Sequence, residues 1–110
     1  MAATKGEVRE LVRRFAQEVA ASGIRVDHVI LYGSHARGGV HETSDINVAV
    51  VSPDLGRDPF EEALTLREIA LRLDPHLVPE PYSREEYRTA AEGDFLHDEV
   101  LAKGEEVALS

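Results

Sequence analysis

Apolar and polar residues alternate with a helical period over the first twenty or so residues. The apolar positions that share one face are Val8, Leu11, Val12, Phe15 and Val19. Thr4 and Glu7 form a T-x-x-E capping box in front of this face, and Gly23 suits the left-handed position that follows a helix. The pattern therefore predicts a helix that begins after Thr4 and ends near Ser22.

Two short apolar runs then predict strands. Arg25–Gly33 contains the run VILY, with apolar side chains on both faces, as in a central strand that is covered on both sides. Asp45–Ser52 (DINVAVVS) is typical of a second central strand, closed by Pro53. The segment between them, Gly33–Ser44, is rich in Gly, Ser, Thr and His and is predicted to be a loop, or a loop with one helical turn.

The second half begins with a second helix. Asp58 as cap, Pro59 at the first helical position and Glu61 soon after are typical of a helix start. We expect the apolar face of this helix to consist of Phe60, Ala63, Leu64, Ala70 and Leu71. The helix should end by Asp74.

The remaining residues predict one strand and short helices. The prolines of His76–Pro81 suit the edge or the end of a strand. Ser83 and Glu86 repeat the capping box and predict a short helix. A last helix of about Asp94–Lys103 would stop at Gly104, and Glu106–Leu109 would add a small strand.

Length and composition indicate the class of protein. A chain of 110 residues has room for one ordinary core, so we expect a single α/β domain over residues 1–110, with a small mixed sheet flanked by helices. No apolar run is long enough to span a membrane, and the N-terminus lacks the apolar core of an export signal. The absence of cysteine excludes disulfides and thiolate metal sites. These features predict a cytoplasmic protein without a membrane partner.

The net charge of −9 lies entirely in one half of the chain. Residues 1–57 hold seven basic and seven acidic residues, whereas residues 58–110 hold five basic and fourteen acidic residues. Such an acidic half would repel a nucleic-acid backbone, so we expect no direct nucleic-acid binding. It would attract a basic protein partner, although acidity that serves only solubility explains the pattern equally well.

One twenty-residue segment, YGSHARGGVHETSDINVAVV, contains the candidate chemistry. Gly33 lets a ligand approach the backbone, and Ser34 with the amides after it can hold a phosphate. Arg37 can reach the same phosphate with a bidentate guanidinium. Asp45 and Asn47 are two residues apart on a predicted strand, so their side chains should point to one face.

An aspartate that faces a glycine–serine turn suits Mg²⁺-dependent phosphoryl transfer, since the metal bridges carboxylate and phosphate oxygens. A glycine-rich hairpin loop followed by a strand-capping aspartate is an equally good reading of the spacing. The segment is not a Walker A loop, because no Gly-Lys-Ser/Thr follows.

The pattern G-S-x-A-R-G, followed by S-D-I-x-[VL]-x-V, resembles the signature of the DNA polymerase β-like nucleotidyltransferase superfamily, and covers Tyr32–Val51. In its small size the chain resembles the minimal nucleotidyltransferases (MNT), which are single-domain proteins that are often paired with HEPN toxins. The resemblance implies a mixed sheet flanked by helices. It also implies Mg²⁺ as cofactor, ATP as substrate and transfer of AMP to a hydroxyl, such as a tyrosine of the toxin.

The resemblance assigns roles by position. Gly33 and Ser34 match the turn that binds the nucleotide phosphates, and Arg37 matches the arginine after it. Asp45 matches the first metal-binding acid. Asn47 stands where the family has a second acid, and an amide offers a metal an oxygen without a negative charge.

The third carboxylate of the family should lie on the strand at His76–Pro81, where Glu80 is the only acid. Val78 has the same facing in a regular strand and is the position at which similar chains are expected to have that acid. The predicted catalytic set is therefore Asp45, Asn47 and Glu80, with Asp45 and Asn47 as metal ligands.

Two functions follow as hypotheses. The first is a HEPN/MNT-type antitoxin that transfers AMP to its toxin, with catalysis weakened by Asn47. The second is a binding module of the same fold that has lost catalysis and neutralises its partner by contact. An antibiotic-modifying enzyme fits less well, because the chain lacks the second domain that would bind the substrate. The sequence also allows the protein to form a homo-oligomer.

Overall fold

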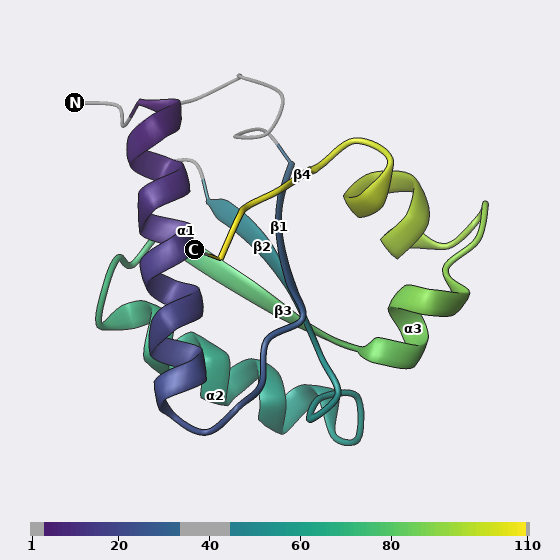
Figure 1. Cartoon of the computed structure of the whole chain (residues 1–110), viewed down its shortest axis with the longest axis horizontal. Coiled ribbons are helices and arrows are strands. Elements are labelled where there is room, and N and C mark those ends of the chain that lie inside the picture. The colour runs from purple at the N-terminus through teal and green to yellow at the C-terminus, as the bar shows by residue number, and fades with distance from the viewer. Residues whose placement is uncertain (1–3, 34–44, 110) are drawn as a thin grey trace.

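A four-stranded mixed sheet forms the centre of the molecule, with the strand order β3-β2-β1-β4 (Figure 1). β1 (His28–Tyr32) pairs antiparallel with both β2 (Ile46–Ser52) and the two-residue β4 (Glu105–Glu106). β3 (Leu77–Ser83) runs parallel to β2 at the edge of the sheet. The prolines of β3 therefore lie on an edge strand, as expected from their missing N–H groups.

The structure is a computed structural model that describes residues 4–33 and 45–109. Ser34 and Arg37, which are predicted to contact phosphate, lie outside the described residues. Within the described parts of the chain, no helix has both the length and the apolar character needed to cross a membrane.

Helices cover both faces of the sheet (Figure 1). α1 (Lys5–Ala21) and α2 (Pro59–Leu71) lie on one face, and α3 (Arg84–Thr89) with a short π-helix, η1 (Leu96–Leu101), lies toward the other. The predicted capping boxes are present at the starts of α1 and α3, and Asp58 caps α2. This arrangement confirms the predicted α/β class with a small mixed sheet flanked by helices.

Alternate residues of the two central strands enter two separate cores. Val29 and Leu31 of β1 pack with α1 and α2, together with Val48 and Val50 of β2. The intervening residues of β1 and β2, such as Ile30, pack on the opposite face with η1. Tyr82 of β3 and Tyr87 of α3 pack against the same core. The continuous apolar run VILY thus lies in a strand that is buried on both faces, as predicted.

The predicted apolar face of α2 is partly wrong. Phe60, Leu64 and Leu71 have relative exposures of 72%, 46% and 52%. The residues that α2 buries are Leu66, Ile69 and Ala70. The helix has apolar residues around much of its circumference, so the spacing alone does not decide which side contacts the sheet.

The C-terminal elements are shorter than predicted. The helix expected at Asp94–Lys103 is the π-helix Leu96–Leu101, and the strand expected at Glu106–Leu109 is Glu105–Glu106. The Ala102 amide donates to the His97 carbonyl at 2.9 Å, which is the wider hydrogen-bonding step of a π-helix.

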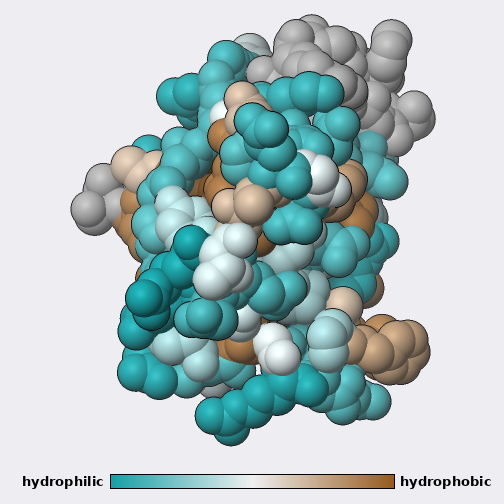
Figure 2. All heavy atoms as spheres, turned by 90° about the vertical axis from the view of Figure 1, so that its right-hand side faces the viewer, coloured by the Kyte–Doolittle hydropathy of each residue, from teal (hydrophilic) through white to brown (hydrophobic). Residues whose placement is uncertain are grey.

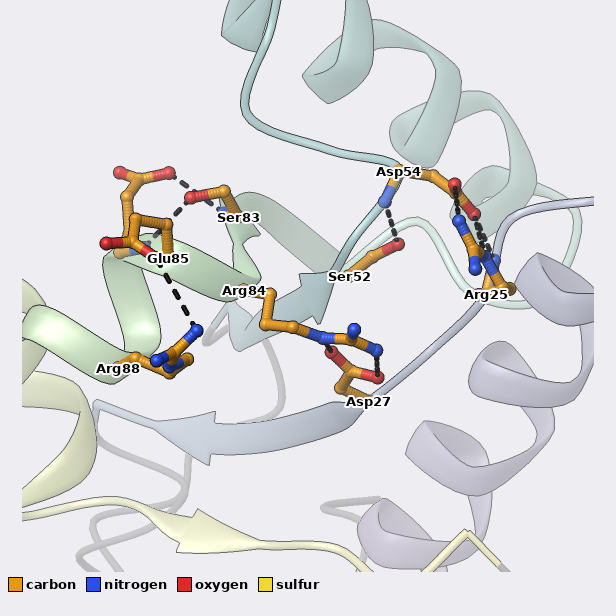
Figure 3. Close-up of polar contacts among 9 residues, drawn as sticks. Arg25, Asp27, Ser52, Asp54, Ser83, Arg84, Glu85 and Arg88 are labelled. Atoms are coloured by element: carbon orange, nitrogen blue, oxygen red, sulfur yellow. Dashed lines mark hydrogen bonds and ion pairs between the residues drawn. The ribbon is translucent and has the colours of Figure 1, made fainter.

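Two arginine–carboxylate pairs join the strands at the end of the sheet opposite Gly33 (Figure 3). The Arg25 guanidinium donates to both carboxylate oxygens of Asp54, at 2.7 and 3.1 Å, and its backbone amide adds a bond of 2.9 Å. Arg84 holds Asp27 in the same bidentate way, at 2.7 and 2.9 Å. The hydroxyl of the fully buried Ser52 accepts a hydrogen bond from the Asp54 backbone amide at 2.9 Å. These bonds connect the entry to β1 with the exits of β2 and β3.

Asp54→Asn should reduce the sensitivity of the fold to acid. The side-chain hydrogen bond from Arg25, with the backbone amide of Arg25 adding to it, lowers the pKa of Asp54 to about 2. A carboxyl whose pKa is lower in the folded state stabilises the fold above its unfolded pKa of about 4 and loses that effect as pH falls. Urea unfolding between pH 5 and pH 2 should therefore show a smaller loss of stability in Asp54→Asn than in the wild type. Parallel pH profiles would contradict this role.

Candidate active site

Gly33 and Asn47 meet at the end of β1. Asn47 of β2 pairs in register with Tyr32, the residue before Gly33. Gly33 has φ +82°, and a Cβ added there would lie 2.8 Å from Asn47 Nδ2. The left-handed backbone favours glycine here, and any larger residue would also force the end of the Asn47 side chain to move. This contact brings the proposed phosphate turn and the second acid position of the family together.

Asp45 lies one residue before β2, and its side chain is exposed. The pairing of β2 with β3 begins at Ile46, whose amide donates to the His76 carbonyl at 2.8 Å. Ile46 and Val48 point into the core beneath α1 and α2. Asp45 thus lies just before β2, at the end of the sheet where Gly33 follows β1.

The register between β2 and β3 decides which residue stands beside Asn47. Asn47 pairs with Val78, and Ala49 pairs with Glu80. Glu80 is therefore two residues farther along the strand, roughly 7 Å from the position beside Asn47. The structure thus places Val78, and not Glu80, beside Asn47. That Val78 stands at the third carboxylate position, and that Glu80 has a catalytic role, stay predictions.

Two tyrosines lie near Glu80 on this face. Burial raises the pKa of the Tyr32 phenol, and the charges of Tyr82 and Glu80 raise it further. Burial also raises the pKa of Tyr82, again with a contribution from Glu80. Both phenols therefore stay protonated near neutral pH, so they can donate hydrogen bonds but cannot act as bases.

The donor set fits one Mg²⁺ better than two. Asp45 supplies a carboxylate, Asn47 an uncharged amide oxygen and Val78 no donor. Among the residues that the structure describes, no group of three or more His, Cys, Asp or Glu side chains could hold a metal ion. Mg²⁺ commonly uses one or two carboxylates together with substrate phosphates and water, and Asp45 would supply one carboxylate of such a set. A pair of ions needs more negative charge than one carboxylate offers.

A hollow of about 320 Å³ opens beside Gly33, between β1 and η1. Its lining residues are Tyr32, Gly33, Phe95, Glu99 and Lys103. The Phe95 and Tyr32 rings meet edge to face, with centroids 6.0 Å apart and an interplanar angle of 79°. Viewed from the side of α3 and η1, the surface is mainly hydrophilic and is interrupted by hydrophobic patches (Figure 2). The only sequence signal for this wall is the i, i+4, i+8 spacing of Phe95, Glu99 and Lys103, which places them on one helical face.

The model of the nucleotidyltransferase domain family matches residues 8–100. The chain belongs to this family. The match includes both Gly33 and the Asp45-x-Asn47 segment, so the resemblance of that motif to nucleotidyltransferases is confirmed at the level of the family. No curated protein matches the sequence.

Two solved structures support the nucleotidyltransferase fold. One is a protein from Sulfolobus solfataricus assigned as a nucleotidyltransferase, with a TM-score of 0.60 and 20% identity, over 76% of this chain and 74% of that chain. The other is a toxin–antitoxin structure with AMP-PNP, with a TM-score of 0.63 and 20% identity, over 93% of this chain and 73% of that chain. At this identity both likenesses show the fold.

Gly33→Val should abolish ATP binding by this nucleotidyltransferase domain. The new side chain would collide with Asn47 and occupy the surface that a phosphate approaches. Gly23→Val is a matched control, because Gly23 has φ +97° but no atom within 4 Å of an added Cβ. The left-handed backbone should cost each variant about 1–2 kcal/mol of stability. Calorimetric titration with ATP, at a temperature where both variants are folded, should show binding by Gly23→Val alone. Equal ATP affinity in Gly33→Val and wild type would show that the turn does not contact the nucleotide.

Proposed function

We propose that this nucleotidyltransferase domain is the cytoplasmic antitoxin of a HEPN-type toxin pair. In this proposal it transfers AMP from ATP to a hydroxyl of the toxin, such as that of a tyrosine. The observation that carries the proposal is the likeness to a toxin–antitoxin structure with AMP-PNP along nearly the whole chain. The Tyr32–Val51 motif, which unites a phosphate turn with a metal-binding acid, supports the nucleotide part of the proposal.

Each residue of the motif has a proposed role. Gly33 and Ser34 seat the β- and γ-phosphates, and Arg37 supports the turn or the phosphates. Asp45 holds Mg²⁺ with the help of the Asn47 amide oxygen. When bound, Mg²⁺ supplies positive charge that neutralises the phosphates and the leaving group.

We expect the transfer to be slow. Asn47 adds no charge, and its neighbour across the strands is Val78. Loss of one preorganised electrostatic contact in an active site lowers the rate on the order of 10²–10³-fold. Glu80 is an acid on the same strand as Val78, but it pairs with Ala49.

The second candidate function is a contact-only module that binds the toxin without modifying it. The pairing of Asn47 with Val78 favours this candidate, because two of the three acid positions then lack a carboxylate. The two candidates share the fold and the partner, and they differ in whether label is transferred from ATP.

Asn47→Asp should increase the transfer of label from α-labelled ATP to the co-encoded toxin. Asn47→Asp combined with Val78→Asp should increase it further, because the register places the two new carboxylates side by side. Asp45→Ala should abolish the transfer. The reactions are compared with Mg²⁺ and with Mn²⁺, and Glu80→Gln tests whether Glu80 takes part.

The outcomes separate the candidates. Strong labelling by the wild type that Asp45→Ala abolishes would contradict a weakened site. No labelling even by the double variant, while the protein still binds and neutralises the toxin, would favour the contact-only module.

Association with the toxin should be fast and sensitive to salt. Residues 58–110 hold fourteen acidic and five basic residues, so this part of the chain would steer a basic partner toward it. Charges on the surface are screened over about 8–10 Å at physiological ionic strength. Association rates measured by stopped flow from low to high salt should fall steeply. A flat profile would show that the acidic half serves solubility instead.

A further inference from the structure

We propose that the hollow between β1 and η1 binds the base of the nucleotide, and that Phe95 stacks on that base. This proposal rests on the proposed function, since it takes the phosphates to lie on the turn at Gly33. It adds to the Tyr32–Val51 motif a nucleoside subsite with Phe95, Glu99 and Lys103, which lie outside that motif.

The position of the hollow supports this assignment. Gly33 is both the start of the proposed phosphate turn and a lining residue of the hollow. A nucleotide whose phosphates lie at Gly33 therefore has its nucleoside within reach of Phe95. The volume of about 320 Å³ is at the lower end of the range of about 300–1,000 Å³ for small-molecule sites, and it suits one nucleoside.

Phe95 has an aromatic surface that the fold does not use. Its side chain is 56% exposed, although the next residue, Leu96, is buried in the core. The edge-to-face contact with Tyr32 leaves ring surface open toward the solvent. Aromatic rings of this kind stack on nucleic-acid bases with little preference among them, because every base has a π-face.

The polar groups of the hollow suit the rest of a nucleoside phosphate. Lys103 Nζ lies 3.2 Å from each carboxylate oxygen of Glu99, in an exposed pair whose net contribution to stability is small. Both groups are therefore available to a ligand. Lys103 can bind a phosphate oxygen, and Glu99 can accept a hydrogen bond from an amino group of the base.

The wall formed by η1 is held firmly against β1. Val100 is fully buried on the inner side of η1. A Cβ added to Gly104, just after the segment, would lie only 2.8 Å from the Leu31 carbonyl oxygen. Gly104 thus lets the end of this segment lie directly against β1.

A tryptophan at position 95 can report on stacking, because the chain contains no tryptophan. In Phe95→Trp, titration with ATP or adenosine should quench the indole fluorescence, whereas inorganic tripolyphosphate should not. Phe60→Trp is the matched control, since Phe60 is 72% exposed on α2, which covers the other face of the sheet. Its emission should not change with any of the three probes. Quenching of Phe95→Trp by tripolyphosphate as strongly as by ATP would overturn the stacking assignment.

Binding affinities provide the second test. Phe95→Ala should raise the Kd for ATP about 5- to 150-fold, which is the usual loss of about 1–3 kcal/mol for one stacked base. Its affinity for tripolyphosphate should equal that of the wild type, and Phe95→Tyr should restore ATP binding. Thermal unfolding checks that the variants are folded.

The failure of this proposal and the failure of the proposed function are distinguishable. If wild type and Phe95→Ala bind ATP equally, the nucleoside subsite is wrong while the nucleotide-binding turn stands. If the folded wild type binds neither ATP nor tripolyphosphate, both the subsite and the nucleotide part of the proposed function are wrong.

Discussion

The burial of β1 on both of its faces is the constraint on which the rest of the molecule depends. Four of its five residues are buried, and they alternate between the core beneath α1 and α2 and the core beneath η1. β1 also has a hydrogen-bonded strand on each side. A strand in this position needs a layer on each face, and α1 with α2 on one face and η1 on the other supply these layers. The C-terminal end of β1 leads directly into Gly33, so a strand that is paired on both sides and buried on both faces supports the candidate site.

Local signals predicted most of the elements. The capping boxes at Thr4–Glu7 and Ser83–Glu86 and the start at Asp58 are formed by residues close in sequence, so their geometry depends little on the rest of the fold. The inner face of α2 could not be predicted in the same way. Leu66 and Ile69 are buried while Phe60 is exposed, and that choice depends on where β3 and α1 lie. The π-helix at Leu96–Leu101 was also predicted only as a helix.

At the candidate site, too, local sequence signals predicted some residues but not those that depend on tertiary packing. The motif identified Gly33, Asp45 and Asn47 from sequence, because the turn and the following strand are close neighbours in the chain. The contact partner of Asn47 depends on the register of β2 with β3, which joins residues about thirty positions apart and has no local signal. Phe95 and Lys103 were missed for a related reason. Their spacing is typical of an exposed helical surface, and only the packing of η1 on β1 turns that surface toward Gly33.

The prolines of β3 restrict how this domain can assemble. Pairing of β3 with β2 continues past Pro79 and Pro81, so the N–H groups that these residues lack are missing from the open edge of the strand. At the other side of the sheet, β4 is only two residues long. Among the residues that the structure describes, neither edge of the sheet offers the continuous row of donors and acceptors that another chain needs in order to add a strand. These two edges therefore disfavour assembly by strand addition and edge-to-edge aggregation.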